Sequence, residues 1–295
     1  MKKAMKLLSV FLAACVIAVS LCSCAKKAQY EQIERQSTKS VAAVTFNCAA
    51  PWGNVIKGTG SSARVKRFAQ YMSAVSPDFI GTQEMNSEWL EKLSALLPDY
   101  ESYGVKRGGD ENERKSEINA VFWLKGEYEA VEKGTFWLSE TPEEESRYDG
   151  AGCNRVCTWV VLNQLSTGKL ILFMNTHLDN ASEQAADYGA QVIVDKMAEI
   201  TSHYDGIATV LTGDFNETQG MQAYNTAASV LTDTLTAFPE RKAGTYQDWG
   251  EPDNEEPIDF IFVSPKTQTV DYQVLNDLSG GYISDHFGVY SEFVI

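Results

Sequence analysis

Apolar residues from position 41 onward follow two patterns, short apolar runs and longer stretches with helical spacing. The run over 41–46 is typical of a buried strand, whereas Val65, Phe68 and Met72 recur at the spacing of one helix face. Strands are expected at 41–46, 79–83, 118–124, 128–138, 156–164, 169–175, 208–211, 258–263, 269–274 and 287–293. Helices are expected at 62–75, 86–97, 181–200 and 221–230.

Hairpin signals and helical crossovers both occur in this pattern. A turn over 165–168 joins two strands as a hairpin, while other strands are separated by whole helices. This combination favours mixed sheets flanked by helices over a purely parallel, doubly wound sheet. Three polar loops, at 106–117, 140–154 and 246–257, are long for connections, and long loops often surround a substrate site.

The first 40 residues form a separate region. Three lysines precede an almost wholly apolar run over 7–21, which is the layout of a secretory signal and is short for a membrane span. The sequence Leu21-Cys22-Ser23-Cys24 then resembles a bacterial lipobox, which implies a signal peptide over 1–24 and a lipid on Cys24. An ordinary signal peptide, an uncleaved anchor helix and a lipobox ending at Cys15 are the alternatives. We expect a polar tether over 25–40 and one domain over 41–295.

Charge and cysteine content restrict the classes of function. The formal net charge is −15, and it becomes −18 without residues 1–23, which carry three lysines and no acidic residue. A field of that sign repels polyanions, so nucleic acid is disfavoured as a partner. The predicted domain has three cysteines, an odd number that excludes a full disulfide framework. Cys153 and Cys157 form one local bridge, or they remain buried thiols like Cys48.

Several predicted strands end at, or are interrupted by, a polar residue suited to catalysis. Leu211-Thr-Gly-Asp-Phe-Asn216 ends a strand with an acid and an amide two positions apart, a pair that can hold a hydrated cation or orient a water. Ile283-Ser-Asp-His286 sets an acid beside a histidine, a pair used for metal ligation or proton transfer. The other polar residues of this kind are Asn47, Glu84, His177 and Asp259.

Each of these signals also has a purely structural explanation. Gly-Asp and Asn are common turn formers, and a single Glu is usually a solvated surface residue. Asp259 is less easily explained, because it lies inside a very apolar strand and the burial of an isolated charge is costly. His286 is the natural candidate for its partner.

In chain order, the series Asn, Glu, His, Asp-x-Asn, Asp and Asp-His resembles the endonuclease/exonuclease/phosphatase superfamily, the deoxyribonuclease I-like fold. The resemblance covers residues 41–295. It extends to the bacterial exported branch through Phe136-Trp-Leu-Ser-Glu-Thr-Pro142, Arg155-Val-Cys-Thr-Trp159 and Asn175-Thr-His-Leu-Asp179. It implies an α/β four-layer sandwich of two packed mixed β-sheets flanked by α-helices.

The resemblance also implies a metal site and a group that activates water. Asn47, Glu84 and Asp285 match the family's metal-binding residues, with Mg²⁺ as the expected ion and Mn²⁺ as the alternative. Asp214 matches the residue that aligns or deprotonates the attacking water, and Asn216 matches its partner.

Further matches concern the scissile phosphate. Asp259 and His286 match the family's Asp–His pair, and His177 matches the histidine that stabilises the transition state or assists the leaving group. In relatives that histidine pairs with a carboxylate from an earlier strand, a position that Glu117 supplies here. Arg155 matches a phosphate clamp, with a salt bridge among the many acidic residues as its alternative role.

These residues predict a metal-dependent phosphodiesterase or phosphatase in which activated water attacks a small or lipid-linked phosphoester directly. The sequence has no phosphate-binding loop and no covalent nucleophile motif. We expect an exported, lipid-anchored protein of a bacterial cell envelope without an obligate protein partner. A secreted nuclease and a non-catalytic ligand-binding lipoprotein are the alternatives. Glu255-Glu256-Pro257 stands where many relatives carry a basic residue, which weakens the case for a polyanionic substrate.

Overall fold

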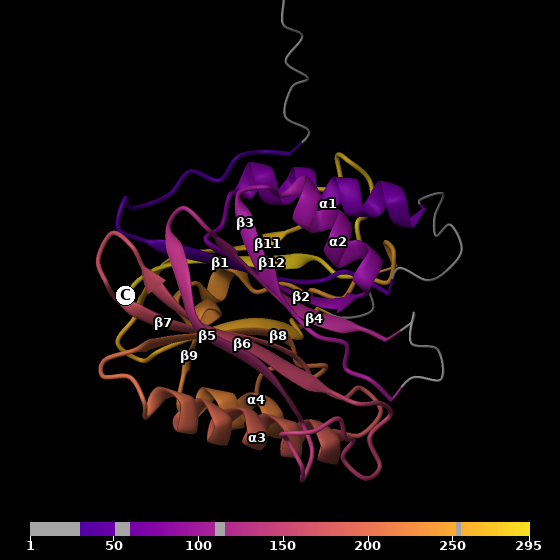
Figure 1. Cartoon of the computed structure of the whole chain (residues 1–295). Helices are drawn as coiled ribbons and strands as arrows, with labels where there is room; N and C mark the ends of the chain where they lie inside the picture. Colours follow the sequence, from indigo (N-terminus) through magenta and orange to yellow (C-terminus); the bar gives the residue numbers. More distant parts are fainter. Residues whose placement is uncertain (1–29, 51–59, 110–115, 252–254) are drawn as a thin grey trace, which may run out of the picture.

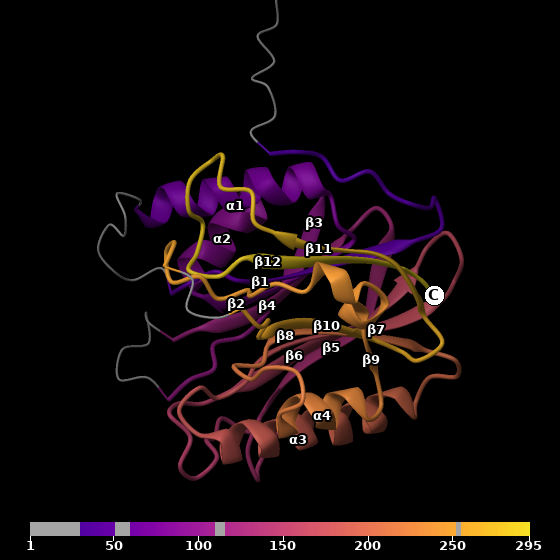
Figure 2. The ribbon, with the colours of Figure 1, turned by 180° about the vertical axis from the view of Figure 1, so that it is seen from behind.

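The computed structural model describes residues 30–50, 60–109, 116–251 and 255–295. Within these ranges, two six-stranded sheets pack face to face, and helices cover their outer faces (Figures 1 and 2). The four layers confirm the predicted fold class. The signal peptide, Cys24 and parts of two predicted loops lie outside the described residues.

The first sheet has the strand order β11-β12-β1-β2-β4-β3. Of its five strand pairs among the described residues, only β1 with β2 is parallel. The strands are β1 (Val41–Asn47), β2 (Phe79–Met85), β3 (Tyr100–Tyr103), β4 (Ile118–Leu124), β11 (Gln268–Leu275) and β12 (Gly288–Val294). Its outer face is covered by α1 (Ser61–Val75) and α2 (Ser87–Leu96) (Figure 1). Asn86 caps α2, as predicted, by accepting a hydrogen bond from the Trp89 amide at 2.9 Å.

The second sheet has the strand order β5-β6-β7-β8-β10-β9, with β7 and β8 parallel. The strands are β5 (Tyr128–Trp137), β6 (Val156–Gln164), β7 (Leu170–His177), β8 (Ala208–Asp214), β9 (Thr232–Asp233) and β10 (Asp259–Val263). Its outer face is covered by α3 (Glu183–Thr201) and α4 (Gln222–Ala228), which Figure 2 shows side by side.

Side-chain alternation along the strands explains the layers. In β1, Ala42, Val44 and Phe46 pack against α1, while Val41 and Ala43 face the second sheet. Strands covered on both faces are apolar at nearly every position, which is why they read as continuous runs in the sequence. The same alternation determines which face of the sheet the polar side chains at the strand ends point to.

Two strands were not predicted from the sequence. Both β3 and β9 are short, with four and two residues, and β3 is only partly buried at the edge of its sheet. Short edge strands lack the long apolar run that marks an interior strand. Cys48, Cys153 and Cys157 are all free thiols, so the local bridge between Cys153 and Cys157 is not formed. No helix among the described residues is long and apolar enough to cross a membrane.

Residues 30–40, part of the predicted tether, lie against the domain. The Tyr30 ring stacks on the Tyr71 ring of α1 with centroids 4.3 Å apart. Arg35 forms an ion pair of 2.6 Å with Asp78, which precedes β2. The backbone amides of residues 36 and 37 donate to the buried carboxylate of Glu292 in β12. This arm is therefore bound to the first sheet by specific polar contacts.

Candidate active site

The polar residues singled out in the sequence gather at one end of the sandwich. This is the end where β1, β2, β7 and β8 finish and where β10 and β12 begin. In the second sheet, Asp214 of β8 is the register partner of both His177 in β7 and Asp259 in β10. From the first sheet, the amide of Asn47 donates to Asp214 at 2.9 Å. The polar residues at the strand ends of both sheets thus form one cluster.

Asp214 occupies the centre of this cluster. Its side chain is almost fully buried, and one carboxylate oxygen, Oδ2, lies 2.9 Å from Asn47 Nδ2, 3.5 Å from His177 Nε2 and 3.8 Å from His286 Nε2. Burial, and after it the negative charge of Asp259, raise the pKa of Asp214 to about 7. A carboxylate with that pKa is suited to accepting a proton near neutral pH.

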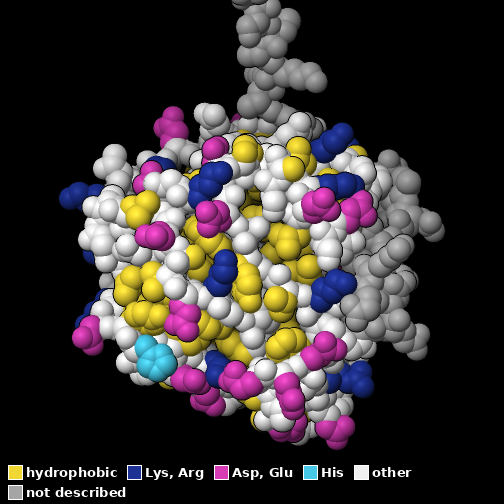
Figure 3. All heavy atoms as spheres, in the orientation of Figure 1, with side chains coloured by type: hydrophobic (Ala, Val, Ile, Leu, Met, Phe, Trp, Pro, Cys, Tyr) yellow, Lys and Arg dark blue, Asp and Glu magenta, His cyan; other side chains and the backbone are white. Residues whose placement is uncertain are grey.

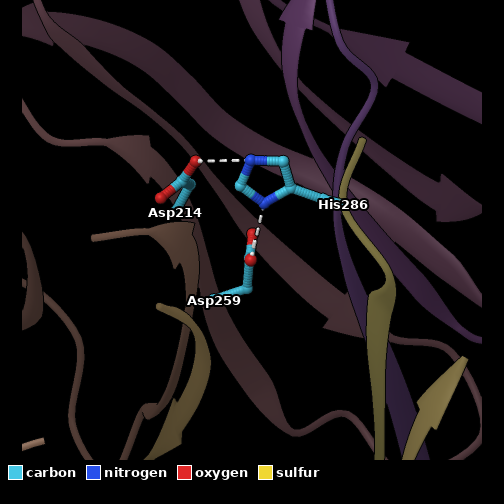
Figure 4. A group of neighbouring side chains, drawn as sticks. All are labelled: Asp214, Asp259 and His286. Atoms are coloured by element: carbon cyan, nitrogen blue, oxygen red, sulfur yellow. Dashed lines mark hydrogen bonds and ion pairs between the residues drawn. The ribbon is translucent and has the colours of Figure 1, made fainter. Parts of the chain in front are cut away.

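His286 lies between two carboxylates (Figure 4). Its Nδ1 is 2.9 Å from Asp259 Oδ2, which confirms the predicted contact. Burial alone would lower the pKa of His286, but the carboxylates of Asp259 and Asp214 raise it to about 10. The ring is therefore an imidazolium at neutral pH. The second oxygen of Asp259 is buried without a hydrogen-bond partner among the described residues.

Asn216 reaches the site through a turn rather than by strand alternation. β8 ends at Asp214, and Asn216 follows with a φ of 52°, a conformation that asparagine tolerates better than most residues. Its backbone amide donates to Asp214 Oδ1 at 2.9 Å, and its side-chain amide donates to the Leu178 carbonyl at 3.0 Å. Asn216 thus holds Asp214 and the end of β7 together.

His177 is a neutral imidazole, in contrast to His286. Burial, and after it the charges of Arg155 and Arg107, lower the pKa of His177 well below its usual value. Its Nδ1 is buried without a hydrogen-bond partner among the described residues. The predicted pairing with Glu117 is therefore not formed. Glu117 instead forms an ion pair of 2.6 Å with Arg107, because this arginine lies on the neighbouring segment and offers a full charge.

Two of the three predicted metal-binding residues, Glu84 and Asp285, form a second acidic group, and the third, Asn47, links Glu84 to Asp214. Glu84 lies in a bulge between β2 and β4 and has a φ of 58°, a left-handed conformation that is uncommon for a residue other than glycine. Its carboxylate accepts from Asn47 Nδ2 at 3.0 Å and from the Ala50 amide at 2.7 Å. Burial raises the pKa of Asp285. The charge of His286 lowers this pKa, and the negative charge of Glu84 raises it further. The negative charge of Glu84 therefore acts on Asp285.

Arg155 adopts the salt bridge that was its alternative role. Its Nε lies 3.4 Å from Asp179 Oδ2, and its Nη2 donates to Asn180 Oδ1 at 2.9 Å. It is nevertheless close to His177, whose pKa it lowers. An arginine that is oriented by one carboxylate can still present its remaining N–H groups to an anion.

The structure contains a buried polar layer beneath the site that was not predicted from the sequence. Gln83 Nε2 donates to Asn175 Oδ1 at 2.6 Å and to Thr45 Oγ1 at 3.0 Å. Thr212 Oγ1 donates to the same Asn175 oxygen at 3.1 Å. Thr45, Asn175 and Thr212 each precede a site residue by two positions and so share its strand face. The sequence does contain a signal for this layer, because these polar residues stand inside strands that are otherwise apolar.

The charged side chains of the surface are unevenly distributed. On the face shown in Figure 3, acidic side chains gather at the lower edge over the helical layer, whereas lysine and arginine side chains are scattered singly. This view agrees with the net charge of −15 and shows no basic stripe of the kind that follows a nucleic-acid backbone on that face.

Known proteins resemble this chain in both sequence and fold. The model of the Endonuclease/Exonuclease/phosphatase family matches residues 44–286. No protein with a curated description matches the sequence. A family protein from Bacteroides thetaiotaomicron is 32% identical, with a TM-score of 0.78 over 86% of this chain and 97% of its own. A mannosyl-6-phosphatase from the same organism is also 32% identical, with a TM-score of 0.78. The match covers 86% of this chain and 100% of the phosphatase. The human Nocturnin catalytic domain is 18% identical, covered over 94% of its length and 86% of this chain, with a TM-score of 0.71 that shows a shared fold.

Proposed function

This chain belongs to the endonuclease/exonuclease/phosphatase family, and from that premise we propose that it hydrolyses a small phosphoester with the help of a divalent cation. The observation that carries the proposal is the environment of one atom, Asp214 Oδ2. Asn47 of β1, His177 of β7 and His286, which precedes β12, all present a nitrogen to it. A convergence of this kind around a buried carboxylate is typical of a catalytic centre.

The residues of the second acidic group fit Mg²⁺, or Mn²⁺ in its place. Glu84 and Asp285 are partly buried carboxylates, and the charge of Glu84 acts on Asp285, an arrangement that a cation stabilises. Oxygen donors of this type are the ligands that Mg²⁺ prefers. When bound, such an ion would offset negative charge on the phosphoryl oxygens.

The Asp214, Asp259 and His286 group also brings possible ligand atoms within 4.8 Å of one another. We assign proton transfer and charge stabilisation to it instead. His286 Nδ1 lies 2.9 Å from Asp259 Oδ2, and the carboxylates of Asp259 and Asp214 raise the pKa of the ring, which favours its protonated form as a hydrogen-bond donor. Its positive charge then offsets part of the negative charge of the two buried carboxylates.

In the proposed mechanism, Asp214 accepts the proton of the attacking water. Asn47 and the Asn216 backbone amide fix its carboxylate through both oxygens, so that it keeps one orientation. The imidazolium of His286, held by Asp259, donates to a phosphoryl oxygen and stabilises the charge of the transition state. His177, being neutral, donates a hydrogen bond to the phosphoryl group or the leaving oxygen without adding charge. The leaving oxygen takes up a proton from solvent water, and Asp214 returns its proton to solvent.

A phosphomonoester of a sugar is the substrate class that we propose to test first. Support comes from the mannosyl-6-phosphatase, which shares 32% of its sequence and aligns over 100% of its length. The acidic net charge and the acidic pair Glu255-Glu256 also favour a small substrate over a long polyanion. We retain export and lipidation at Cys24 as a proposal drawn from the sequence.

The test is hydrolysis by the purified protein without residues 1–24. The panel contains mannose 6-phosphate, glucose 6-phosphate, a chromogenic phosphodiester, plasmid DNA and single-stranded DNA, each with Mg²⁺ and with EDTA. We expect phosphate release from the sugar phosphates with Mg²⁺, none with EDTA, and none from the Asp214→Asn variant. Faster cleavage of DNA would favour a nuclease, and inactivity across the panel would favour a binding protein.

A further inference from the structure

Arg64 is a buried cation beside the site that the proposed mechanism does not use. It belongs to α1, and only 3% of its surface is exposed. Arginine is seldom buried to this extent without a paired carboxylate. Among the residues that the structure describes, no carboxylate lies within ion-pair distance of it, although the charges of Asp285 and Glu84 act on it. Its burial therefore needs another explanation.

Aromatic rings and backbone carbonyls take the place of a carboxylate. The guanidinium carbon lies 5.1 Å from the ring centroid of Trp89 in α2 and 5.1 Å from that of Trp249. Both contacts are cation–π interactions. One guanidinium nitrogen, Nη2, donates to the Cys48 carbonyl at 2.6 Å and also to the Ala49 carbonyl. The planar group is therefore fixed from several directions.

The two carbonyls belong to the turn that orients Asn47. Ala49 has a φ of 49°, which an alanine adopts only when its surroundings hold it there. Its amide donates to Asn47 Oδ1 at 2.9 Å, so that the other end of the Asn47 amide points to Glu84 and Asp214. The next amide, of Ala50, donates to Glu84 at 2.7 Å. Arg64 thus anchors the turn that places two of the predicted metal-binding residues.

Trp249 connects Arg64 to the third predicted metal-binding residue. Trp249 also has a positive φ, of 58°, and lies in the turn that begins at Gln247. The Gln247 backbone amide donates to the Asp285 carbonyl at 2.8 Å, and its side chain donates to the Ser284 carbonyl at 2.7 Å. The segment that carries Asp285 and His286 is therefore held by the same turn that covers Arg64.

We propose that Arg64 is a positioning residue of the phosphoester site, which holds the 47–50 turn and the 247–249 turn in the arrangement that brings Asn47, Glu84 and Asp285 together. The inference rests on the proposed function. Substitution of a residue that hydrogen-bonds to a metal ligand and so orients it typically lowers metal affinity or activity by about 10- to 100-fold. The planar shape of the guanidinium is essential here, because it meets two rings and two carbonyls at once.

The experiment compares Arg64→Lys, which keeps the charge but not the plane, with Arg64→Met, which keeps the volume but not the charge. Trp249→Leu removes one ring from outside α1, and Lys66→Met is the control on an exposed position of the same helix. We expect both Arg64 variants to lower kcat and Mn²⁺ affinity, measured by calorimetry, by about 10- to 100-fold with little change in KM. Trp249→Leu should have a smaller effect in the same direction, and Lys66→Met none.

Several outcomes would overturn the inference. Wild-type kcat and Mn²⁺ affinity in Arg64→Lys would show that only charge is required. A lower melting temperature with unchanged kcat and Mn²⁺ affinity, in Trp249→Leu or in a folded Arg64 variant, would show a purely structural role. A wild-type protein that neither hydrolyses a phosphoester nor binds Mn²⁺ would overturn the proposed function and this inference with it.

Discussion

Acidic side chains are buried at both ends of the sandwich, but their surroundings differ. Where β1 and β2 begin, Asp78 accepts hydrogen bonds from Arg35, the Ala42 amide and Tyr128, so that both of its oxygens are paired. Glu292 at the same end accepts from the amides of residues 36 and 37 and from the Ser40 hydroxyl. At the opposite end, Asp259 Oδ1 and His177 Nδ1 are buried without partners among the described residues.

The difference separates a structural use of buried charge from a functional one. Buried polar groups are normally paired, because an unpaired one costs about 1–3 kcal/mol. The paired carboxylates can therefore stabilise the fold, whereas the other end keeps an unpaired carboxylate oxygen of Asp259 and a carboxylate, Asp214, whose pKa is raised to about 7. Proteins commonly sacrifice stability in this way at active sites. The comparison predicts that substitutions at the two ends affect different properties.

The largest effect on activity is expected from Asp214→Asn. The amide keeps the shape of the side chain but cannot accept the proton of the attacking water, so kcat/KM should fall by about 10³-fold. The melting temperature should stay the same or rise, because the substitution removes a buried charge that is repelled by Asp259. Steady-state kinetics and a thermal melt check both parts. A large loss of stability would mean that Asp214 is a structural residue like Asp78.

His286→Ala should affect both properties. It removes the charge that we assign to the phosphoryl oxygens, for a loss of activity of about 10²-fold. It also leaves Asp259 buried and unpaired, at a cost of about 3 kcal/mol in the free energy of unfolding. The matched control is the double variant His286→Ala with Asp259→Asn. Denaturant unfolding should show recovered stability in the double variant, while its activity stays low.

Glu292→Ala is the corresponding change at the paired end. Two backbone amides and two hydroxyls, of Ser40 and Tyr290, lose their acceptor, which should lower the free energy of unfolding by about 3 kcal/mol. The kcat should remain that of the wild type below the melting temperature, because the site lies at the other end of the strands. A reduced kcat in folded protein would show that the two ends are coupled.

Glu117→Gln is expected to have the smallest effect on activity. Glu117 pairs with Arg107 rather than with His177, so kcat should change by no more than about threefold, far less than the loss of 10²-fold or more expected for a general acid–base partner. The kinetics of the variant are measured beside those of Asp214→Asn. A loss of similar size in both variants would restore the pairing implied by the family resemblance.

The fold and most residues of the cluster could be predicted from the sequence, and the reason is physical. Strands covered on both faces are long apolar runs, and a polar residue that ends such a run is visible without coordinates. Asn47, His177 and Asp214 were found in this way, and the contact between Asp259 and His286 followed from the cost of an unpaired buried acid.

Other features depended on contacts that have no local signal. The pairing of Glu117 depends on which partner lies nearest in space, and Arg107 is on an irregular segment. The turn at Asn216 replaced the strand alternation expected from its spacing. Arg64 is the clearest case, because it lies on the buried side of a helix and meets Trp89 and Trp249, which are distant in sequence.

We propose a division of labour between two acidic groups, with the cation at Glu84 and Asp285 and proton transfer at Asp214, Asp259 and His286. Anomalous diffraction from crystals grown with Mn²⁺ tests it directly. We predict an anomalous peak within bonding distance of the Glu84 and Asp285 carboxylates and none between Asp259 and His286. A peak bound by Asp214, Asp259 and His286, with Glu84 and Asp285 left without an ion, would contradict the account.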